Sequence, residues 1–252
     1  MAIIESEPRI RTGNLILDAV PDEEYERLAE SIEPYQLQIS DTLFSTEEES
    51  SWTYFPCEGV ISFLKGFSDG SQVEVGVVGK EGMAGVHAFL GLELEPTAAV
   101  VQCTGASYRI DADVLRREFE RGETLQKLLL RFTSNMLNQL ALTAACNQLH
   151  SVDQRLARWL LAMSDRVVST EIPLSHEFLA HMLGTGRARV TEAIGRFRDQ
   201  GSVRSLRGRI VIEDLETLRE SACECYDEIR RLYASVTAPA PERNRRRATP
   251  VE

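Results

Sequence analysis

The sequence predicts an α+β protein in which a β-rich N-terminal domain, a long helix and a small C-terminal domain follow one another. Three observations predict this order. Short runs rich in Val, Ile, Phe and Thr, separated by turn residues, fill residues 35–110. Residues 112–163 contain no Pro and a single Gly, Gly122. Two segments with helical spacing and an Arg-Gly turn between apolar runs then follow within residues 174–215.

The composition is that of a globular protein. Of the 252 residues, 43% are hydrophobic and 27% are charged, which excludes a largely disordered chain. No run approaches the roughly 18 apolar residues of a membrane span, and the first residues lack the basic and apolar regions of a secretion signal. Five cysteines, an odd number, suit a reducing compartment. We therefore expect a cytoplasmic protein without membrane contact.

Residues 14–110 are expected to form a β jelly roll that begins with a short helical segment. Asp69-Gly70 separates two apolar runs, residues 59–64 and 72–78, and this pattern is a strong signal for a hairpin. Several strands at such close spacing are typical of a sandwich or jelly roll.

Residues 111–149 are expected to contain a long helix with two apolar stripes. One stripe is expected to pair with a second copy of the chain, and its members are Leu125, Leu129, Phe132, Met136, Leu140 and Thr143. A second stripe on another face contains Leu130, Leu137, Ala141 and Ala144. Two stripes favour a helix held between its own domain and a homodimer partner. The alternative is a helix buried in one larger core.

The net charge of −11 conceals an uneven distribution. Residues 1–149 hold 11 basic and 24 acidic residues, whereas residues 150–252 hold 17 Arg, no Lys and 15 acidic residues. Residues 187–209 alone hold seven Arg and two acidic residues. An acidic chain with such a local cluster can still bind a polyanion there.

The segment 150–234 is expected to form a DNA-binding domain. Ser175 is a good N-cap for a short helix that ends at Gly184-Thr185-Gly186. A second helix begins near Arg187, and a small hairpin turns at Arg207-Gly208. This order describes a winged helix-turn-helix, whose second helix enters the major groove of double-stranded DNA. The alternative is an ordinary helical pair with a solvated arginine face.

The same segment resembles the Crp/Fnr family of bacterial transcription regulators. The residues that carry the resemblance are Leu174–Ala180, Leu183-Gly184, Arg187, Val190-Thr191 and Gly208–Asp214. The resemblance implies a cyclic-nucleotide-binding-like β-domain, a homodimer and a palindromic operator whose half-sites lie about one DNA turn apart. RNA polymerase is a further candidate partner.

The resemblance also assigns candidate DNA contacts. Arg187 is expected to pair with guanine and Glu192 with cytosine, whereas Ala188 offers no polar group. This set departs from a common Arg-Glu-Arg reader of the family and predicts a different operator. The expected DNA-binding residues are Ser175, His176, Arg187, Ala188, Arg189, Thr191, Glu192, Arg196, Arg204, Arg207 and Arg209.

The resemblance leaves the effector open. The turn glycines of the family's cyclic-nucleotide pocket are present, but Pro96 precedes Thr97-Ala98 where an Arg would bind the phosphate. Glu93 and Glu95 lie nearby. This argues against cyclic AMP, because a phosphate would be buried without its cation. The residues expected to contact an effector are Gly82, Met83, Gly85, Thr97 and Ala98.

No metal, haem or catalytic site is expected. The cysteines lack the N-terminal grouping of the family's iron–sulfur sensors. Cys223 and Cys225 are expected to lie on different faces of a helix, and the four His show no metal-binding spacing. Two alternatives remain, a cyclic-nucleotide-binding module that controls a partner protein and a cupin-like enzyme. Residues 235–252 are expected to form a flexible basic tail.

Overall fold

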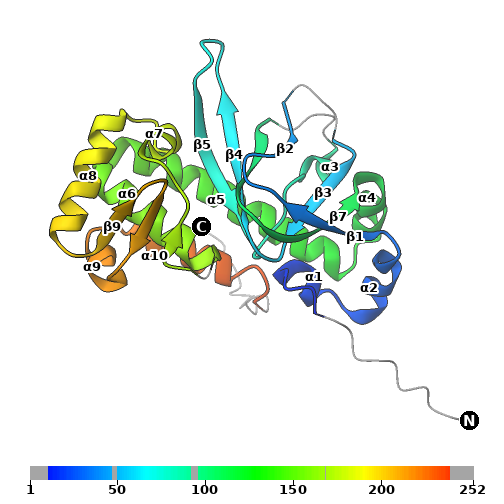
Figure 1. Ribbon diagram of the computed structural model, residues 1–252. Coiled ribbons are helices and arrows are strands. Elements are labelled where there is room, and N and C mark those ends of the chain that lie inside the picture. Colours follow the sequence, from blue (N-terminus) through cyan, green and yellow to red (C-terminus); the bar gives the residue numbers. More distant parts are fainter. Residues whose placement is uncertain (1–10, 47–49, 92–95, 168, 239–252) are drawn as a thin grey trace, which may run out of the picture.

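The computed structural model describes residues 11–46, 50–91, 96–167 and 169–238. These ranges form a β-domain, a long helix and a C-terminal α/β domain, in the order that the sequence predicts (Figure 1). None of the helices among the described residues has the length and apolar character needed to cross a bilayer. Most of the basic tail, residues 239–252, lies outside the described ranges.

The β-domain is a jelly roll of two antiparallel sheets. One sheet has the strand order β1-β7-β3 and the other β2-β6-β4-β5. Side chains from both sheets, including Phe55 and Ile61, share one buried core. The elements are α1 (Leu15–Ala19), α2 (Asp22–Ala29), β1 (Ile32–Leu37), β2 (Thr42–Phe44), β3 (Trp52–Pro56), β4 (Val60–Gly66), β5 (Gln72–Val78), α3 (His87–Leu90), β6 (Ala98–Cys103) and β7 (Gly105–Asp111).

Two glycines allow a close approach of the loops at one end of the sheets. A Cβ at Gly59 would lie 2.5 Å from the carbonyl oxygen of Cys103, and Gly59 has a φ of +77°. A Cβ at Gly105 would lie 2.4 Å from the backbone of Glu58. A side chain at either position would collide with the facing backbone. The turns before β4 and between β6 and β7 therefore require glycine at these two positions.

The helical connection consists of α4 (Ala112–Glu120) and α5 (Thr124–Leu149). Gly122, with a φ of +76°, separates them, as expected for a residue that ends a helix. The carboxylate of Glu24 accepts hydrogen bonds from the backbone N–H groups of Thr124 and Leu125 at 3.0 and 2.9 Å. Although burial opposes the shift, these bonds lower the pKa of Glu24. Glu24 therefore caps the positive end of α5.

The C-terminal domain surrounds a three-stranded sheet with the order β8-β10-β9. Strand β8 was not expected from the sequence. The elements are α6 (Val152–Val167), β8 (Glu171–Ile172), α7 (His176–Met182), α8 (Arg187–Asp199), β9 (Val203–Leu206), β10 (Arg209–Ile212), α9 (Leu215–Glu220) and α10 (Cys225–Ala234). The core of this domain also includes Val60, Leu64 and Val77 of the β-domain. The two domains therefore pack directly on each other.

Candidate nucleic-acid interface

Helices α7 and α8 form the helix-turn-helix that the sequence predicts. The Oγ of Ser175 accepts a hydrogen bond from the backbone N–H of Phe178 at 3.1 Å and caps α7. Gly184 adopts a φ of +56°, and the N–H of Thr185 bonds to the carbonyl of Ala180 at 2.9 Å. The positive φ closes the tight turn, which any side chain with a Cβ would strain.

Helix α8 presents one face to the domain core and another to solvent. Its buried face consists of Val190, Ala193, Ile194 and Phe197, as the spacing predicts. The predicted DNA-binding positions on α8 are all exposed, namely Arg187, Ala188, Arg189, Thr191, Glu192 and Arg196. In the hairpin, Arg204, Arg207 and Arg209 are exposed as well. The N-terminal turn of α8 therefore projects from the molecule.

The exposed arginines differ in whether a carboxylate of the chain already holds them. Arg196 forms two hydrogen bonds to Asp153, at 2.5 and 2.6 Å. Arg204 pairs with Glu213 at 2.6 Å, and Arg209 pairs with Glu171 at 2.7 Å. Within the described residues, Arg187, Arg189 and Arg207 have no carboxylate partner. These three guanidinium groups are available for DNA without first breaking an ion pair.

His176, the first residue of α7, contacts both α8 and β9. Its Nδ1 lies 3.1 Å from the Oγ1 of Thr191, and its Nε2 lies 3.1 Å from the Oγ of Ser205. The Thr191 hydroxyl donates to the carbonyl of Arg187 at 3.0 Å, so Nδ1 is the nitrogen that carries hydrogen. Burial, and then the charge of Arg187, lower the pKa of His176. A neutral His176 thus ties α7 to α8 and β9, and the DNA contact expected of it stays a prediction.

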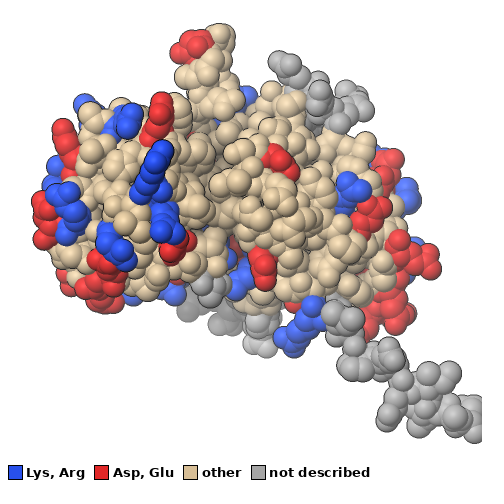
Figure 2. Space-filling view, viewed as in Figure 1, with Lys and Arg blue, Asp and Glu red and all other residues tan. Residues whose placement is uncertain are grey.

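The charge distribution agrees with this interface. Figure 2 shows Lys and Arg side chains spread over the end of the molecule formed by α7, α8 and the β9–β10 hairpin, with acidic side chains between them. The opposite end, around α2 and α4, carries many acidic side chains. A cationic surface at one end of an acidic body orients the approach to a polyanion.

Comparisons with known proteins identify the helix-turn-helix domain. A family profile described as a Crp-like helix-turn-helix domain matches residues 154–221, which contain α7, α8 and the hairpin. These residues therefore form a Crp-like helix-turn-helix domain. The chain is 24% identical over 209 residues to the CRP-like cAMP-activated global transcriptional regulator of Mycobacterium tuberculosis, covering 77% of this chain and 90% of that protein.

Solved structures show the same fold. A putative transcriptional regulator of the Crp/Fnr family from Eubacterium rectale has a TM-score of 0.65 at 14% identity, covering 82% of this chain and 96% of that one. The c-di-GMP responsive global regulator CLP from Xanthomonas campestris has a TM-score of 0.62 at 15% identity, covering 76% of this chain and 99% of that one. The Crp/Fnr arrangement of β-domain, long helix and helix-turn-helix domain therefore extends through most of this chain.

The residues expected to bind an effector do not form an open site in this structure. Met83 is fully buried in the β-domain core, and a Cβ at Gly82 would lie 2.1 Å from the ring of Phe132. Gly82 and Met83 are therefore core positions in this structure, and their contact with an effector stays a prediction. Thr97 and Ala98 are half-buried at the start of β6. Glu93 and Glu95 lie outside the described residues.

The stripe of α5 assigned to a dimer contact is also corrected. Leu125, Leu129 and Phe132 are buried in the core of their own β-domain, and Met136 packs against it. The side chain of Leu140 lies next to Gly76 on β5, and Thr143 faces the same junction. The exposed stripe is the second one, in which Leu130 and Leu137 are 47% and 63% exposed. Both stripes are apolar, so spacing alone does not identify the inner one.

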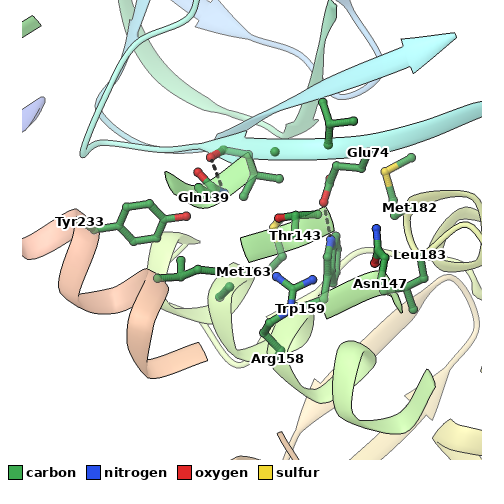
Figure 3. A pocket seen from close by; sticks show the side chains of 15 residues that line it. Glu74, Gln139, Thr143, Asn147, Arg158, Trp159, Met163, Met182, Leu183 and Tyr233 are labelled. Carbon is green, nitrogen blue, oxygen red and sulfur yellow. Dashed lines mark hydrogen bonds between the residues drawn. The ribbon is translucent and has the colours of Figure 1, made fainter. Parts of the chain in front are cut away.

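A narrow pocket lies where the β-domain meets the DNA-binding domain (Figure 3). Glu74 on β5 accepts a hydrogen bond from the indole N–H of Trp159 on α6 at 2.8 Å. Arg158 lies beside Trp159, and Tyr233 of α10 closes the other side. The open space is about 20 Å³, which suits a water molecule and excludes an effector. This junction is a packed contact between the two domains.

Burial raises the pKa of Glu74 to about 7. The carboxyl also contacts the Oγ of Ser62 at 2.7 Å, and Ser62 in turn bonds to the side-chain oxygen of Gln102. A protonated Glu74 can donate its hydrogen to Ser62 while the Ser62 hydroxyl donates to Gln102. Each of the two contacts then has one hydrogen between its two oxygens. Ionised Glu74 would compete with Gln102 for the single hydroxyl hydrogen of Ser62.

This junction is expected to weaken as the pH rises. In the unfolded chain the Glu74 carboxyl ionises near pH 4.5, whereas in the folded chain it stays protonated to about pH 7. The contribution of Glu74 to stability is therefore fully present below pH 4.5 and is lost as the pH rises through 7. We expect the difference in unfolding free energy between Glu74→Gln and the native chain to change by roughly 2–3 kcal/mol from pH 5 to pH 8, in favour of the variant. Urea titrations at both pH values measure it, and parallel pH profiles would contradict it.

Proposed function

We propose that the chain regulates transcription as a homodimer that binds a palindromic DNA operator. The observation that carries the proposal is the exposed N-terminal turn of α8, where Arg187 and Arg189 have no carboxylate partner among the described residues. Backbone N–H groups and the helix dipole at this end favour phosphate, and arginine is the side chain best suited to the paired acceptors of guanine.

Specific roles follow from the positions of the side chains. Arg187 is the proposed guanine reader, with Glu192 one turn further along α8. Arg189 and Arg207 are proposed to contact phosphates, because they are exposed and unpaired on either side of the reading position. Arg196, Arg204 and Arg209 contribute less, since each would have to exchange a carboxylate of the chain for a phosphate.

The exposed stripe of α5 supports the homodimer. Leu130, Ser134, Leu137, Ala141 and Ala144 are exposed and alternate in steps of four and three, the spacing of a two-stranded coiled coil. Large apolar side chains that stay exposed at this spacing favour a second helix as partner. A twofold axis along α5 would place two copies of α8 on one side of the dimer, which is the arrangement that a palindrome requires.

The effector is proposed to differ from cyclic AMP. The regulator from Mycobacterium tuberculosis is described as cAMP-activated, whereas the one from Xanthomonas campestris is described as c-di-GMP responsive. Residues 79–100 of this chain contain no Arg, and Gly82 and Met83 are occupied by core packing. A cyclic phosphate would therefore lack an arginine partner in this stretch, and core packing leaves it little space at Gly82 and Met83.

Selection of DNA from a random pool by the purified full-length chain tests the proposal. We expect an enriched palindrome with half-sites about one helical turn apart, and the same motif with or without added cyclic AMP. Affinity for it should fall steeply with salt, because each neutralised phosphate releases counterions. A pool that keeps no palindromic motif, or binding that does not depend on salt, would contradict the proposal.

A further inference from the structure

Four side chains of the type that binds metal ions converge where α5 meets the DNA-binding domain. Cys146 lies in the last turn of α5, and His150 follows the end of that helix. Cys223 lies in the turn after α9, and Cys225 is the first residue of α10. One Sγ or ring nitrogen from each of the four lies within 4.8 Å of all the others. Residues up to 79 positions apart in the sequence thus form a single cluster.

This convergence corrects the expectation for the two C-terminal cysteines. Cys223 and Cys225 were expected on different faces of one helix, but α10 begins only at Cys225. Because Cys223 lies in the preceding turn, both sulfurs can point to the same place. All three thiols are buried, and they form a small cluster of their own.

Two of the six distances between the ligand atoms are close to the edges of a tetrahedron around one ion, and all six are within 4.8 Å. The Sγ atoms of Cys146 and Cys223 are 3.5 Å apart, and the Sγ of Cys225 is 3.7 Å from the Nδ1 of His150. Zinc bonds of about 2.3 Å to sulfur and about 2.0–2.1 Å to nitrogen place two tetrahedral sulfurs about 3.8 Å apart, and a sulfur and a nitrogen about 3.6 Å apart. A cluster of several irons would hold its ligands farther apart.

The surroundings of the four side chains also suit a metal. The Nε2 of His150 lies 3.3 Å from a carboxylate oxygen of Glu224, which leaves Nδ1 to face the three sulfurs. Carboxylates that hold the outer nitrogen of a ligand histidine in this way are typical of zinc sites.

A disulfide explains less of the arrangement. All five cysteines are free, and a bond between Cys146 and Cys223 would need an S–S distance of about 2.05 Å. It would involve only two of the four side chains. It would not account for the contact of Cys225 with His150 or for that of His150 with Glu224. Ordinary buried thiols would not require an imidazole among them.

We propose that Cys146, His150, Cys223 and Cys225 bind one Zn²⁺ ion in a structural Cys₃His site. The site joins the end of α5 to the turn before α10, so the ion fixes the angle between the long helix and the DNA-binding domain. Binding releases the protons of the thiols. The proposal concerns metal binding and is independent of the DNA that the chain recognises. It replaces the expectation that the chain holds no metal.

Metal analysis of the full-length chain, purified without a histidine tag and under reducing conditions, tests the proposal. We expect about one zinc per chain. Cys146→Ser and Cys223→Ser should each hold less than about 0.1 zinc, whereas the matched control Cys57→Ser should keep the native content. Glu224→Gln should keep one zinc but bind it about 10- to 100-fold more weakly in competition with a chelator.

A second measurement guards against variants that fail to fold. The native chain, stripped of metal and loaded with Co²⁺ under reducing conditions, should show the intense visible absorption of tetrahedral cobalt and the thiolate-to-cobalt charge-transfer band in the near ultraviolet. Three results would overturn the proposal: reduced chain that takes up no Zn²⁺, full zinc content in a folded Cys146→Ser variant, or iron with acid-labile sulfide in place of zinc. Since no DNA is present, none of these outcomes bears on operator binding.

Discussion

Arg187→Ala is expected to weaken binding of the selected operator by between about 30-fold and 10⁴-fold. A bidentate hydrogen-bonded contact between arginine and guanine contributes about 1–3 kcal/mol. The variant homodimer loses two such contacts, one in each half-site. Discrimination at one base pair in each half-site should disappear, because Arg189, the other unpaired guanidinium of this turn, is assigned to phosphate. Titrations of the native and variant operators by fluorescence anisotropy at fixed salt measure both effects.

Two matched variants separate reading of bases from attraction to phosphate. Arg207→Ala, in the hairpin, should weaken binding to all sequences by a similar factor and reduce the salt dependence by about one counterion per site. Arg198→Ala, which removes an exposed side chain paired with Asp199 near the end of α8, should leave affinity unchanged. If Arg187→Ala weakened every DNA sequence equally, Arg187 would be a phosphate contact and the assignment of the reader would be wrong.

Leu137→Glu is expected to raise the dissociation constant of the homodimer by at least about 100-fold. Leu137 is 63% exposed in the single chain, and burying a leucine contributes about 1.5–3 kcal/mol. Each dimer contains two copies, and the substitution would also bring two carboxylates together. Sedimentation velocity over a dilution series measures the constant. Operator affinity should fall in parallel, because a single chain contacts only one half-site.

Two further variants distinguish the stripes of α5. Leu90→Glu places the same charge at another exposed leucine, 43% exposed in α3, and should leave the dimer intact. Leu129→Ala removes a fully buried side chain from the β-domain core and should cost about 2–5 kcal/mol of folding stability without loosening the dimer. A dimer that survives Leu137→Glu but dissociates in Leu129→Ala would restore the sequence-based assignment of the interface.

Local patterns were sufficient for the elements of the helix-turn-helix. The N-cap at Ser175, the turn at Gly184 and the buried face of α8 all follow from rules that act within about one helical turn. The same holds for the hairpin around Gly208, with its φ of +74°. These features are predictable because the residues that form them are close both in the sequence and in space.

The sequence by itself determined the order of the domains, the recognition helix and its outward-facing arginines. Only the tertiary structure decided which stripe of α5 is free, since both stripes are apolar and packing against the β-domain selects between them. It also decided which arginines are unpaired, because Asp153 and Glu171 reach Arg196 and Arg209 from distant segments. The four-residue cluster around Cys146 arises in the same way. Contacts between residues far apart in the chain depend on how whole elements pack, and no local spacing encodes that.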